Sequence, residues 1–383
     1  MNPADIPLSV YIHWPWCLAK CPYCDFNSHR APSPSTRDTS RETYVRALLR
    51  DLESQQALVQ GRSAHTVFLG GGTPSLFTPD EVGRVLESLS AAVTFEPDTE
   101  VTMEVNPGAL EHGSLAGYRA AGVNRVSIGA QSFDTAALQR LGRLHSPDET
   151  RSAVDQARAA GFERINIDLM HGLPGQNLEA GQSDVRSAIA LDVDHISYYQ
   201  LTLEPNTRFH AFPPQLPDES VLEDIAASGA TALKGAGFEQ YEVSAWSKPG
   251  QACRHNLNYW LFGDYLAIGA GAHGKLSFSD GVYRYARAAH PRSYMEVAVQ
   301  PPEITVLDDA AVAFEFMLNA LRLADGFSSA VFEQRTGRSF ELIRQRIETA
   351  VGRGLMVSHE ADRWTTTDLG KRFLNDLQAH FLS

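Results

Sequence analysis

The feature that most constrains the fold is an alternation of apolar, β-branched runs with helical stretches, which repeats about six times before residue 240. The expected strands cover residues 9–13, 66–69, 99–105, 125–128, 164–169 and 195–200. The expected helices cover residues 41–59, 79–92, 115–121, 147–160, 178–190 and 220–237. Such alternation implies a parallel sheet with helices outside it. Six units suit an open barrel better than one closed by eight, so we expect an α/β fold built on a partial (β/α)6 barrel.

The pattern changes after residue 237, and the rest of the chain predicts two further parts. Residues 253–274 are rich in aromatics and glycine and are expected to be irregular, and Pro301-Pro302 marks a linker. Expected helices at 308–323, 328–336, 340–353 and 367–377, with strands at 355–357 and 363–365, indicate a mainly helical, winged-helix-like region. We therefore divide the chain into a barrel (1–240), an irregular linking segment (241–302) and a C-terminal domain (303–383).

Three cysteines on one loop after the first expected strand predict a metal centre. Cys17, Cys21 and Cys24 have the spacing C-x-x-x-C-x-x-C. Iron–sulfur clusters are held by cysteine thiolates, and three thiolates on a four-iron cluster leave one iron free for another ligand. A structural zinc site normally closes with a fourth ligand, and neither His13 nor His29 lies at a familiar zinc spacing. The spacing favours a cluster, with zinc or a group of buried thiols as alternatives.

The remaining composition indicates a reducing compartment and argues against nucleic acid as a partner. Only one other cysteine, Cys253, occurs in 383 residues, too few for a disulfide scaffold. No signal segment opens the sequence and no apolar run approaches the roughly 20 residues of a membrane span, so we expect a soluble, cytoplasmic protein. A net charge of −13 disfavours a broad nucleic-acid face. The winged-helix fold often binds DNA, but this negative charge favours a structural or substrate-capping role for the C-terminal region.

Polar residues follow the expected strands, where a parallel sheet of this kind places its site. Gly70–Pro74 lacks the Lys-Ser/Thr of a phosphate loop, but its glycines would let a ligand approach the backbone; a tight turn is the alternative. Glu104, Gln131, Arg143 and Asp168 lie at or beyond strand ends. Carboxylates there could hold ribose hydroxyls, and an arginine could bind a carboxylate. For a single Glu or Asp taken alone, a helix cap or a surface ion pair is the favoured interpretation.

A second candidate site lies in the aromatic segment. His255, with Asn256, Tyr259 and Trp260, suggests a planar aromatic ligand, because imidazole is a common haem ligand and Tyr and Trp supply flat apolar surface. The alternative is a buried histidine packed among aromatics. Cys253 is expected to be a small buried residue, although its thiol could also meet iron.

With these residues in hand, the chain resembles the radical S-adenosylmethionine (SAM) superfamily, and within it the oxygen-independent coproporphyrinogen III oxidase group. The motifs that carry the resemblance are Tyr11-Ile-His-Trp-Pro-Trp-Cys17, Gly70–Pro74, Glu104-Val-Asn-Pro107, Ser127-Ile-Gly-Ala-Gln131 and Ile167-Asp-Leu-Met-His-Gly-Leu-Pro-Gly175. The chain departs from that oxidase in having Phe26 where the oxidase pattern has a fourth cysteine, and in lacking an N-terminal extension before the cysteine loop. Phe26 and the His255-Asn-x-x-Tyr-Trp260 motif are similar to the haem chaperone HemW family.

The resemblance implies cofactors and roles for particular residues. A [4Fe–4S] cluster would be held by three cysteines, SAM would bind the free iron, and haem would be cargo with His255 as its candidate ligand. The residues implied are Cys17, Cys21 and Cys24 for the cluster; Gly71, Gly72 and Thr73 for the methionine part of SAM; Glu104, Gln131, Arg143 and Asp168 for other SAM contacts; and Tyr11 and Tyr23 beside the cluster loop.

The resemblance also implies a function: a haem chaperone that delivers haem to respiratory proteins, with a homodimer as a further expected assembly. The alternative is a radical SAM enzyme acting on a porphyrinogen. Coproporphyrinogen oxidase activity is not expected, and whether SAM is cleaved in turnover is left open.

Overall fold

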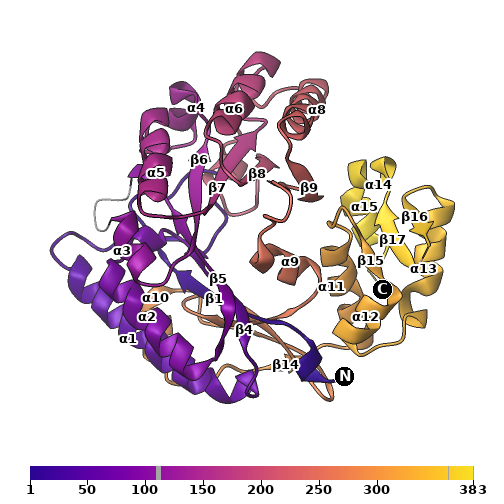
Figure 1. Cartoon of the computed structure of the whole chain (residues 1–383), viewed down its shortest axis with the longest axis horizontal. Coiled ribbons are helices and arrows are strands. Elements are labelled where there is room, and N and C mark those ends of the chain that lie inside the picture. The colour runs from indigo at the N-terminus through magenta and orange to yellow at the C-terminus, as the bar shows by residue number, and fades with distance from the viewer. Residues whose placement is uncertain (109–113, 361, 383) are drawn as a thin grey trace.

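The computed structural model describes residues 1–108, 114–360 and 362–382. Six parallel strands lie side by side in chain order, as expected: β1 (Leu8–Trp14), β4 (Ala64–Gly71), β5 (Phe95–Val105), β6 (Arg125–Gln131), β7 (Arg164–His171) and β8 (His195–Gln200). The main helices lie outside this sheet (Figure 1): α1 (Arg37–Gln55), α2 (Pro79–Ala92), α3 (Leu115–Ala120), α5 (Pro147–Ala159), α6 (Leu178–Ala190) and α8 (Glu219–Gly235). The predicted α/β partial barrel is confirmed.

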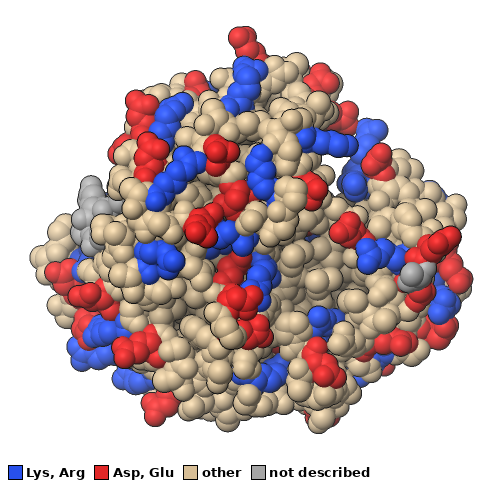
Figure 2. All heavy atoms as spheres, viewed as in Figure 1, with Lys and Arg blue, Asp and Glu red and all other residues tan. Residues whose placement is uncertain are grey.

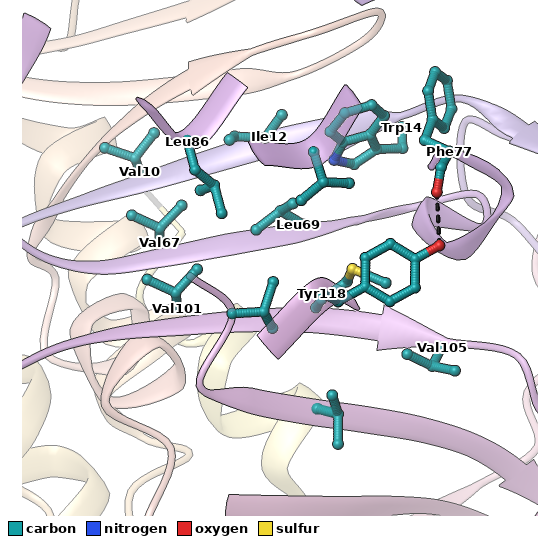
Figure 3. Packing of buried hydrophobic residues seen from close by; sticks show 14 of the residues in the cluster. Val10, Ile12, Trp14, Val67, Leu69, Phe77, Leu86, Val101, Val105 and Tyr118 are labelled. Carbon is teal, nitrogen blue, oxygen red and sulfur yellow. Dashed lines mark hydrogen bonds between the residues drawn. The ribbon is translucent and has the colours of Figure 1, made fainter. Parts of the chain in front are cut away.

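The outer face of the sheet is apolar because alternate strand residues point toward the helices. Val10, Ile12 and Trp14 of β1 are fully buried and pack with residues of neighbouring strands and helices (Figure 3). Tyr118 of α3 spans this layer, and its hydroxyl donates to the Phe77 carbonyl oxygen at 2.6 Å. Burial of these side chains supplies the main favourable free energy of the barrel, at roughly 25 cal/mol per Å² of apolar surface.

The inner face of the same strands is polar. The Ser9 hydroxyl lies 2.7 Å from that of Thr66 on the next strand. Further round the barrel, the Asn166 amide donates to Ser127 and to Asp168, each at 2.7 Å. These groups are shielded from solvent and satisfy one another, as buried polar groups must. The interior of the barrel thus carries a polar hydrogen-bond network below the strand ends.

The sheet continues beyond the six strands at both edges to a total of twelve strands in the described residues. On one side lie β11 (Asp264–Ile268), parallel to β1, and then the antiparallel strands β12 (His273–Phe278), β13 (Gly281–Ala286) and β14 (Thr305–Val306). On the other side lie β10 (Ala245–Ser247) and β9 (Glu239–Glu242), both antiparallel to their neighbours.

The stretch that we expected to be irregular is thus largely regular. Gly269 and Gly271 have positive φ and form the turn between β11 and β12, so the glycines mark a turn and not a loop region. Asp264 anchors β11 through buried ion pairs to Arg62 at 2.7 Å and Lys275 at 2.9 Å. Burial acts to raise the pKa of Asp264, but the Lys275 and Arg62 charges outweigh burial and hold it below its usual value.

Short elements join these parts. They are η1 (Pro3–Asp5), β2 (Trp16–Cys17), β3 (His29–Arg30), η2 (Gln56–Val59), η3 (Pro74–Leu76), α4 (Thr135–Arg140), α7 (Arg208–Ala211), α9 (Arg254–Trp260) and α10 (Pro291–Val297). The helix expected over residues 41–59 begins earlier, at Arg37, and its last turn is the 3-10 element η2. Within the described ranges, no helix is both long enough and apolar enough to cross a membrane.

The C-terminal region is mainly helical, as expected, and forms a separate group of elements (orange to yellow in Figure 1). It contains α11 (Asp309–Ala320), α12 (Ser329–Thr336), α13 (Glu341–Gly352), α14 (Asp368–Arg372) and α15 (Leu374–Ala379) around a sheet of β15 (Phe327–Ser328), β17 (Arg363–Thr366) and β16 (Met356–His359). The single closing helix that we expected is two helices, separated at Phe373. Phe316, Phe332, Phe340 and Trp364 lie in the apolar core of this region.

Candidate functional site

A cavity of about 420 Å³ opens at the carboxyl ends of the parallel strands, where the cysteine loop covers them. Most of the residues predicted from sequence line it together: Cys17, Cys21, Cys24, Tyr23, Gly71, Gly72, Thr73, Glu104, Gln131, Arg143 and Asp168. Tyr11 and His255 are not among its lining residues. Residues far apart in the sequence therefore meet at one edge of the sheet, as a parallel arrangement requires.

Each cysteine has a polar neighbour beside its sulfur. Thr73 Oγ1 donates to Cys17 Sγ at 3.4 Å, and Arg143 donates to Cys21 Sγ at 3.8 Å. The Cys24 sulfur lies 3.7 Å from the hydroxyl of Ser28. Donors aimed at sulfur stabilise the thiolate form that binds iron.

The chemistry of this donor set fits an iron–sulfur cluster. Burial raises the pKa of the Cys17 thiol to about 11, so a positively charged partner is needed to hold it as a thiolate. Among the residues that the structure describes, no group of three or more His, Cys, Asp or Glu is arranged to hold a single metal ion. Three thiolates can instead bind three different irons of one cluster and leave its fourth iron free for another ligand.

The glycine loop after β4 is shaped by close packing on one side and faces the cavity on the other. Gly71 has a φ of +111°, and a Cβ there would lie 2.4 Å from the His13 ring. A Cβ on Gly72 would lie 2.8 Å from backbone atoms of Trp14 and Trp16. A side chain at either position would push the loop away from β1 and the cysteine loop. Close packing therefore explains why glycine is needed at both positions. The backbone of Gly71 and Gly72 also lines the cavity.

Two carboxyl groups, Glu104 and Asp168, line the cavity in a low-dielectric setting. Glu104 Oε2 accepts the Gly71 N–H at 3.0 Å. Burial and the charge of Asp168 raise the pKa of Glu104 to about 8, and burial also raises that of Asp168. Ser127 donates to Asp168 at 3.1 Å, which partly offsets burial. A ligand that brings a cation or hydroxyl donors would stabilise the ionised form of both carboxyls and lower their pKa, and the ammonium and ribose groups of SAM are of this kind.

Arg143 and Asn106 connect the cluster loop to the strand ends. Arg143 donates to the Gly129 carbonyl oxygen at 2.8 Å and to the Asn106 side chain. Asn106 in turn donates to Thr73 Oγ1 at 3.0 Å. These bonds hold Arg143 across the cavity, where it can meet a carboxylate. Asn106 was not among the predicted site residues, although it belongs to the Glu104–Pro107 motif.

Gln131 is held in a strained position by Tyr199. Its φ is +66°, which a non-glycine residue adopts at some cost, and such conformations cluster at functional sites. The Tyr199 hydroxyl donates to Gln131 Oε1 at 2.7 Å, and both side chains line the cavity. Sequence reasoning missed Tyr199, and the signal that could have identified it is its place near the carboxyl end of the sixth strand.

Tyr11 lies below the cavity. Its hydroxyl is 2.9 Å from His13 Nδ1, and burial followed by the charge of Glu104 raises its pKa. The structure thus places Tyr11 close to the site residues but does not expose it to a ligand in the cavity.

His255 is enclosed by the barrel. It is 2% exposed, Nδ1 lies 2.8 Å from Thr66 Oγ1, and the ring stacks on Phe68 and meets Tyr259 edge-on. Burial lowers its pKa to about 3, so the ring is neutral, and Nε2 has no protein partner among the described residues. A neutral nitrogen of this kind can bind iron, but in this conformation the ring has no open face for a haem.

Comparisons with known proteins agree with this geometry. A model of the radical SAM superfamily matches residues 11–187, and a model of the HemN C-terminal domain matches residues 307–373. The proteins curated as "Heme chaperone HemW" in Haemophilus influenzae and Escherichia coli are each 45% identical to this chain over 98% of both chains. The protein of that name in Mycobacterium tuberculosis is 36% identical over 95% of this chain and 92% of its own.

The solved structure of coproporphyrinogen III oxidase (HemN) from Escherichia coli, described as a radical SAM enzyme, covers 99% of this chain and 90% of its own. It superimposes with a TM-score of 0.82 at 21% identity, which shows a common fold. The 45% identity to the two HemW proteins covers almost the whole chain, and it therefore specifies the family more closely than the shared fold does. The cysteine loop, the cavity below it and this identity place the chain in the HemW haem chaperone family, within the radical SAM superfamily.

Proposed function

We propose that this protein binds haem and delivers it to haem-requiring acceptor proteins. The observation that carries the proposal is the 45% identity to two proteins curated as "Heme chaperone HemW", over 98% of this chain. We further propose that the acceptors are respiratory proteins, that the protein works in the cytoplasm, and that it forms a homodimer. The division into residues 1–240, 241–302 and 303–383 is part of the proposal.

The cavity would hold a [4Fe–4S] cluster and SAM, which together supply one-electron chemistry when bound. The chain contributes ligands and orientation: Cys17, Cys21 and Cys24 bind iron, while Thr73 and Arg143 place hydrogen bonds on two of the sulfurs.

The other walls of the cavity would orient SAM. The backbone at Gly71 and Gly72 forms one wall, and Glu104 and Asp168 offer acceptors to ammonium and hydroxyl groups. Arg143 and Gln131 also line the cavity. Tyr23, which lines the cavity, packs on Phe209 with ring centroids 6.5 Å apart.

A second function, oxidation of a porphyrinogen, is favoured only by the shared fold with coproporphyrinogen III oxidase. Phe26 weighs against it. This residue is 57% exposed and lines the cavity at a position where the oxidase pattern has a cysteine. An exposed phenylalanine beside the cluster loop changes both the polarity and the metal-binding capacity of the cavity mouth, which supports the chaperone proposal.

An anaerobic haem titration of the cluster-reconstituted protein, followed by its Soret absorption, tests the proposal. We expect saturation at about one haem per chain. Transfer is then measured by adding a haem-free respiratory protein and following the shift of the Soret band. The absence of specific haem binding would contradict the proposal, and turnover of coproporphyrinogen under reducing conditions with SAM would establish the alternative function.

A further inference from the structure

The cysteine loop has a second, outer side that borders a groove of about 780 Å³. Cys21 and Cys24 line both this groove and the cavity, so the loop is a partition between the two. Lys20 and Pro22 of the same loop also line the groove. The other lining residues come from the end of α4 and from α7 with its flanks: Gln139, Arg140, Gly142, Asn206, Thr207, Arg208, Phe209 and Phe212. The groove lies within the size range of small-molecule pockets, roughly 300–1,000 Å³.

The charge of the groove is opposite to that of the chain. Lys20, Arg140 and Arg208 line it, and no described aspartate or glutamate does, although the chain carries a net charge of −13. Elsewhere the two signs are mixed, as on the face shown in Figure 2. Within the described ranges, the guanidinium groups of Arg140 and Arg208 have no hydrogen bond or ion pair, and the Lys20 ammonium donates only to the Phe26 carbonyl oxygen. The groove thus offers cations that no protein carboxylate neutralises.

The groove also offers apolar surface. Phe212 is 75% exposed, the largest exposed fraction among the large hydrophobic residues of the described chain. Beside it, Pro22 and the small exposed part of Phe209, which is 9% exposed, add further apolar surface. A ligand with one apolar face and anionic groups could contact the exposed phenylalanine and the unpaired arginines together.

We propose that this groove is the haem-binding site, with the porphyrin face mainly against Phe212 and the two propionate carboxylates on Arg140 and Arg208. This inference rests on the proposed function and adds to it the place of the cargo. Haem combines a flat apolar ring with two carboxylates, which matches the apolar and cationic parts of the groove. The cavity is less suitable, because the cluster and SAM would occupy it and because it presents two carboxyl groups, Glu104 and Asp168, to the propionates.

The position of the groove couples the cargo to the cluster loop. The Phe209 N–H donates to the Pro22 carbonyl oxygen at 2.9 Å, which joins α7 to the loop between Cys21 and Cys24. On the other side, a Cβ on Gly142 would lie 2.9 Å from the Pro22 ring, so α4 also packs closely on the loop. A ligand in the groove therefore rests on the same loop that carries two of the cluster cysteines. Loading of the cluster and loading of haem are expected to influence each other through this loop.

Binding of metal-free protoporphyrin IX to the full-length, cluster-reconstituted chain tests the site without any contribution from an iron ligand. The double variant Arg140→Gln with Arg208→Gln should raise the Kd for protoporphyrin IX at least about tenfold, because each substitution removes a charge-assisted hydrogen bond. The dimethyl ester of protoporphyrin IX should bind the native chain and the double variant about equally weakly. Arg353→Gln, an exposed arginine of the C-terminal region, is the matched control and should leave the Kd unchanged.

The outcomes separate the site from the function. If native protein and double variant bind protoporphyrin IX and haem equally well, the groove is excluded while the haem-binding function stands. If the native chain binds neither compound, the proposed function fails, and the groove with it. If the double variant binds porphyrin normally but its cluster is reduced more slowly by an acidic electron-transfer protein, the groove docks that protein and the proposal is wrong.

Discussion

Burial of polar groups gives the site its chemical character at the scale of single residues. Glu104 and Asp168 line one cavity, where burial raises the pKa of each carboxyl, and Cys17 lies in surroundings that favour its neutral thiol. These groups are destabilising to the empty protein and become favourable when a cofactor brings opposite charge. The site is therefore pre-formed to gain free energy from binding.

Cys21→Ser should abolish the iron–sulfur absorbance after anaerobic reconstitution, because a hydroxyl does not replace a thiolate on iron. Absorbance spectra and iron content per chain measure the effect. Cys253→Ser is the control: Cys253 is buried, with its sulfur 3.5 Å from Glu100 and outside the cavity, and should keep the cluster. An undiminished cluster in the Cys21 variant would overturn the assignment of the cysteine loop.

Glu104 should make the SAM-free protein less stable as the pH rises. Its pKa is raised from 4.5 to about 8 in the folded protein, so between these values the folded state holds a proton that the unfolded chain has lost. Stability contributed by this proton is complete below pH 4.5 and is lost as the pH approaches 8. Glu104→Gln keeps an acceptor for the Gly71 N–H and should flatten the dependence of Tm on pH.

The same pH series on Glu87→Gln provides the comparison, since Glu87 lies exposed on α2. If the Tm of the Glu104 variant falls with pH as steeply as that of the native chain, another group is responsible. Saturating SAM should also remove the native slope if Glu104 meets the ammonium group, because a nearby cation lowers the pKa of the carboxyl.

Sequence reasoning worked best where a residue's chemistry and its place at a strand end agreed. Cys17, Glu104 and Asp168 could be assigned to one site because parallel strands bring their carboxyl ends together. The contacts of His255 could not be predicted, because an aromatic-rich motif has the same appearance whether it packs inside the molecule or binds a ring from outside. Only the position of α9 against β4 distinguishes these cases.

At the scale of elements, α9 packs against β4 and β5 inside the barrel, on the side away from the strand ends that carry the site. Its histidine reaches Thr66 and Phe68 on β4, and the His255 backbone N–H donates to Glu100 of β5 at 3.1 Å. The helix thereby covers the lower polar layer of an open barrel, which would otherwise admit water. The His255-Asn-x-x-Tyr-Trp260 motif, which the sequence suggested as a haem ligand, thus makes packing and hydrogen-bond contacts within the protein in this structure.

His255→Ala should therefore destabilise the protein by about 1–3 kcal/mol, since it removes a buried hydrogen bond and ring packing. Urea denaturation measures this change, and the Soret titration measures haem affinity on the same samples. We expect haem affinity to stay within about twofold of the native value if haem binds in the groove. A large loss of affinity without a loss of stability would instead support haem ligation by His255, as the sequence motif suggested. His255→Gln, which can still bond Thr66, should recover part of the stability.

At the scale of the whole molecule, the extended sheet joins the barrel to the C-terminal region. The backbone N–H of Val243 donates to the Arg322 carbonyl oxygen at 3.1 Å, and that of Ala324 donates to Tyr241 at 3.0 Å. The antiparallel strands past β8 and β11 could not be predicted in position, because short strands between glycines lack a clear period. Their pairing depends on the barrel edges that they cover, which are formed by residues distant in sequence.

Arg322 is the side chain on which this junction depends. It forms an ion pair with Glu242 at 2.9 Å and lies 4.4 Å above the Trp260 ring. Burial raises the pKa of Glu242, and Arg322 opposes that rise. Arg322→Ala should lower the free energy of unfolding by about 1–3 kcal/mol, because it leaves a buried carboxyl without its partner.

The loss should be larger at pH 8 than at pH 5. Without Arg322 the folded-state pKa of Glu242 rises further, so the folded protein retains a proton that the unfolded chain releases, and stability falls as the pH increases. Urea denaturation at the two pH values measures this difference, and the double variant Arg322→Ala with Glu242→Gln should remove it. An equal loss at both pH values would mean that Arg322 acts through its packing on Trp260 and not through its charge, because stacking on a ring does not depend on the protonation of Glu242.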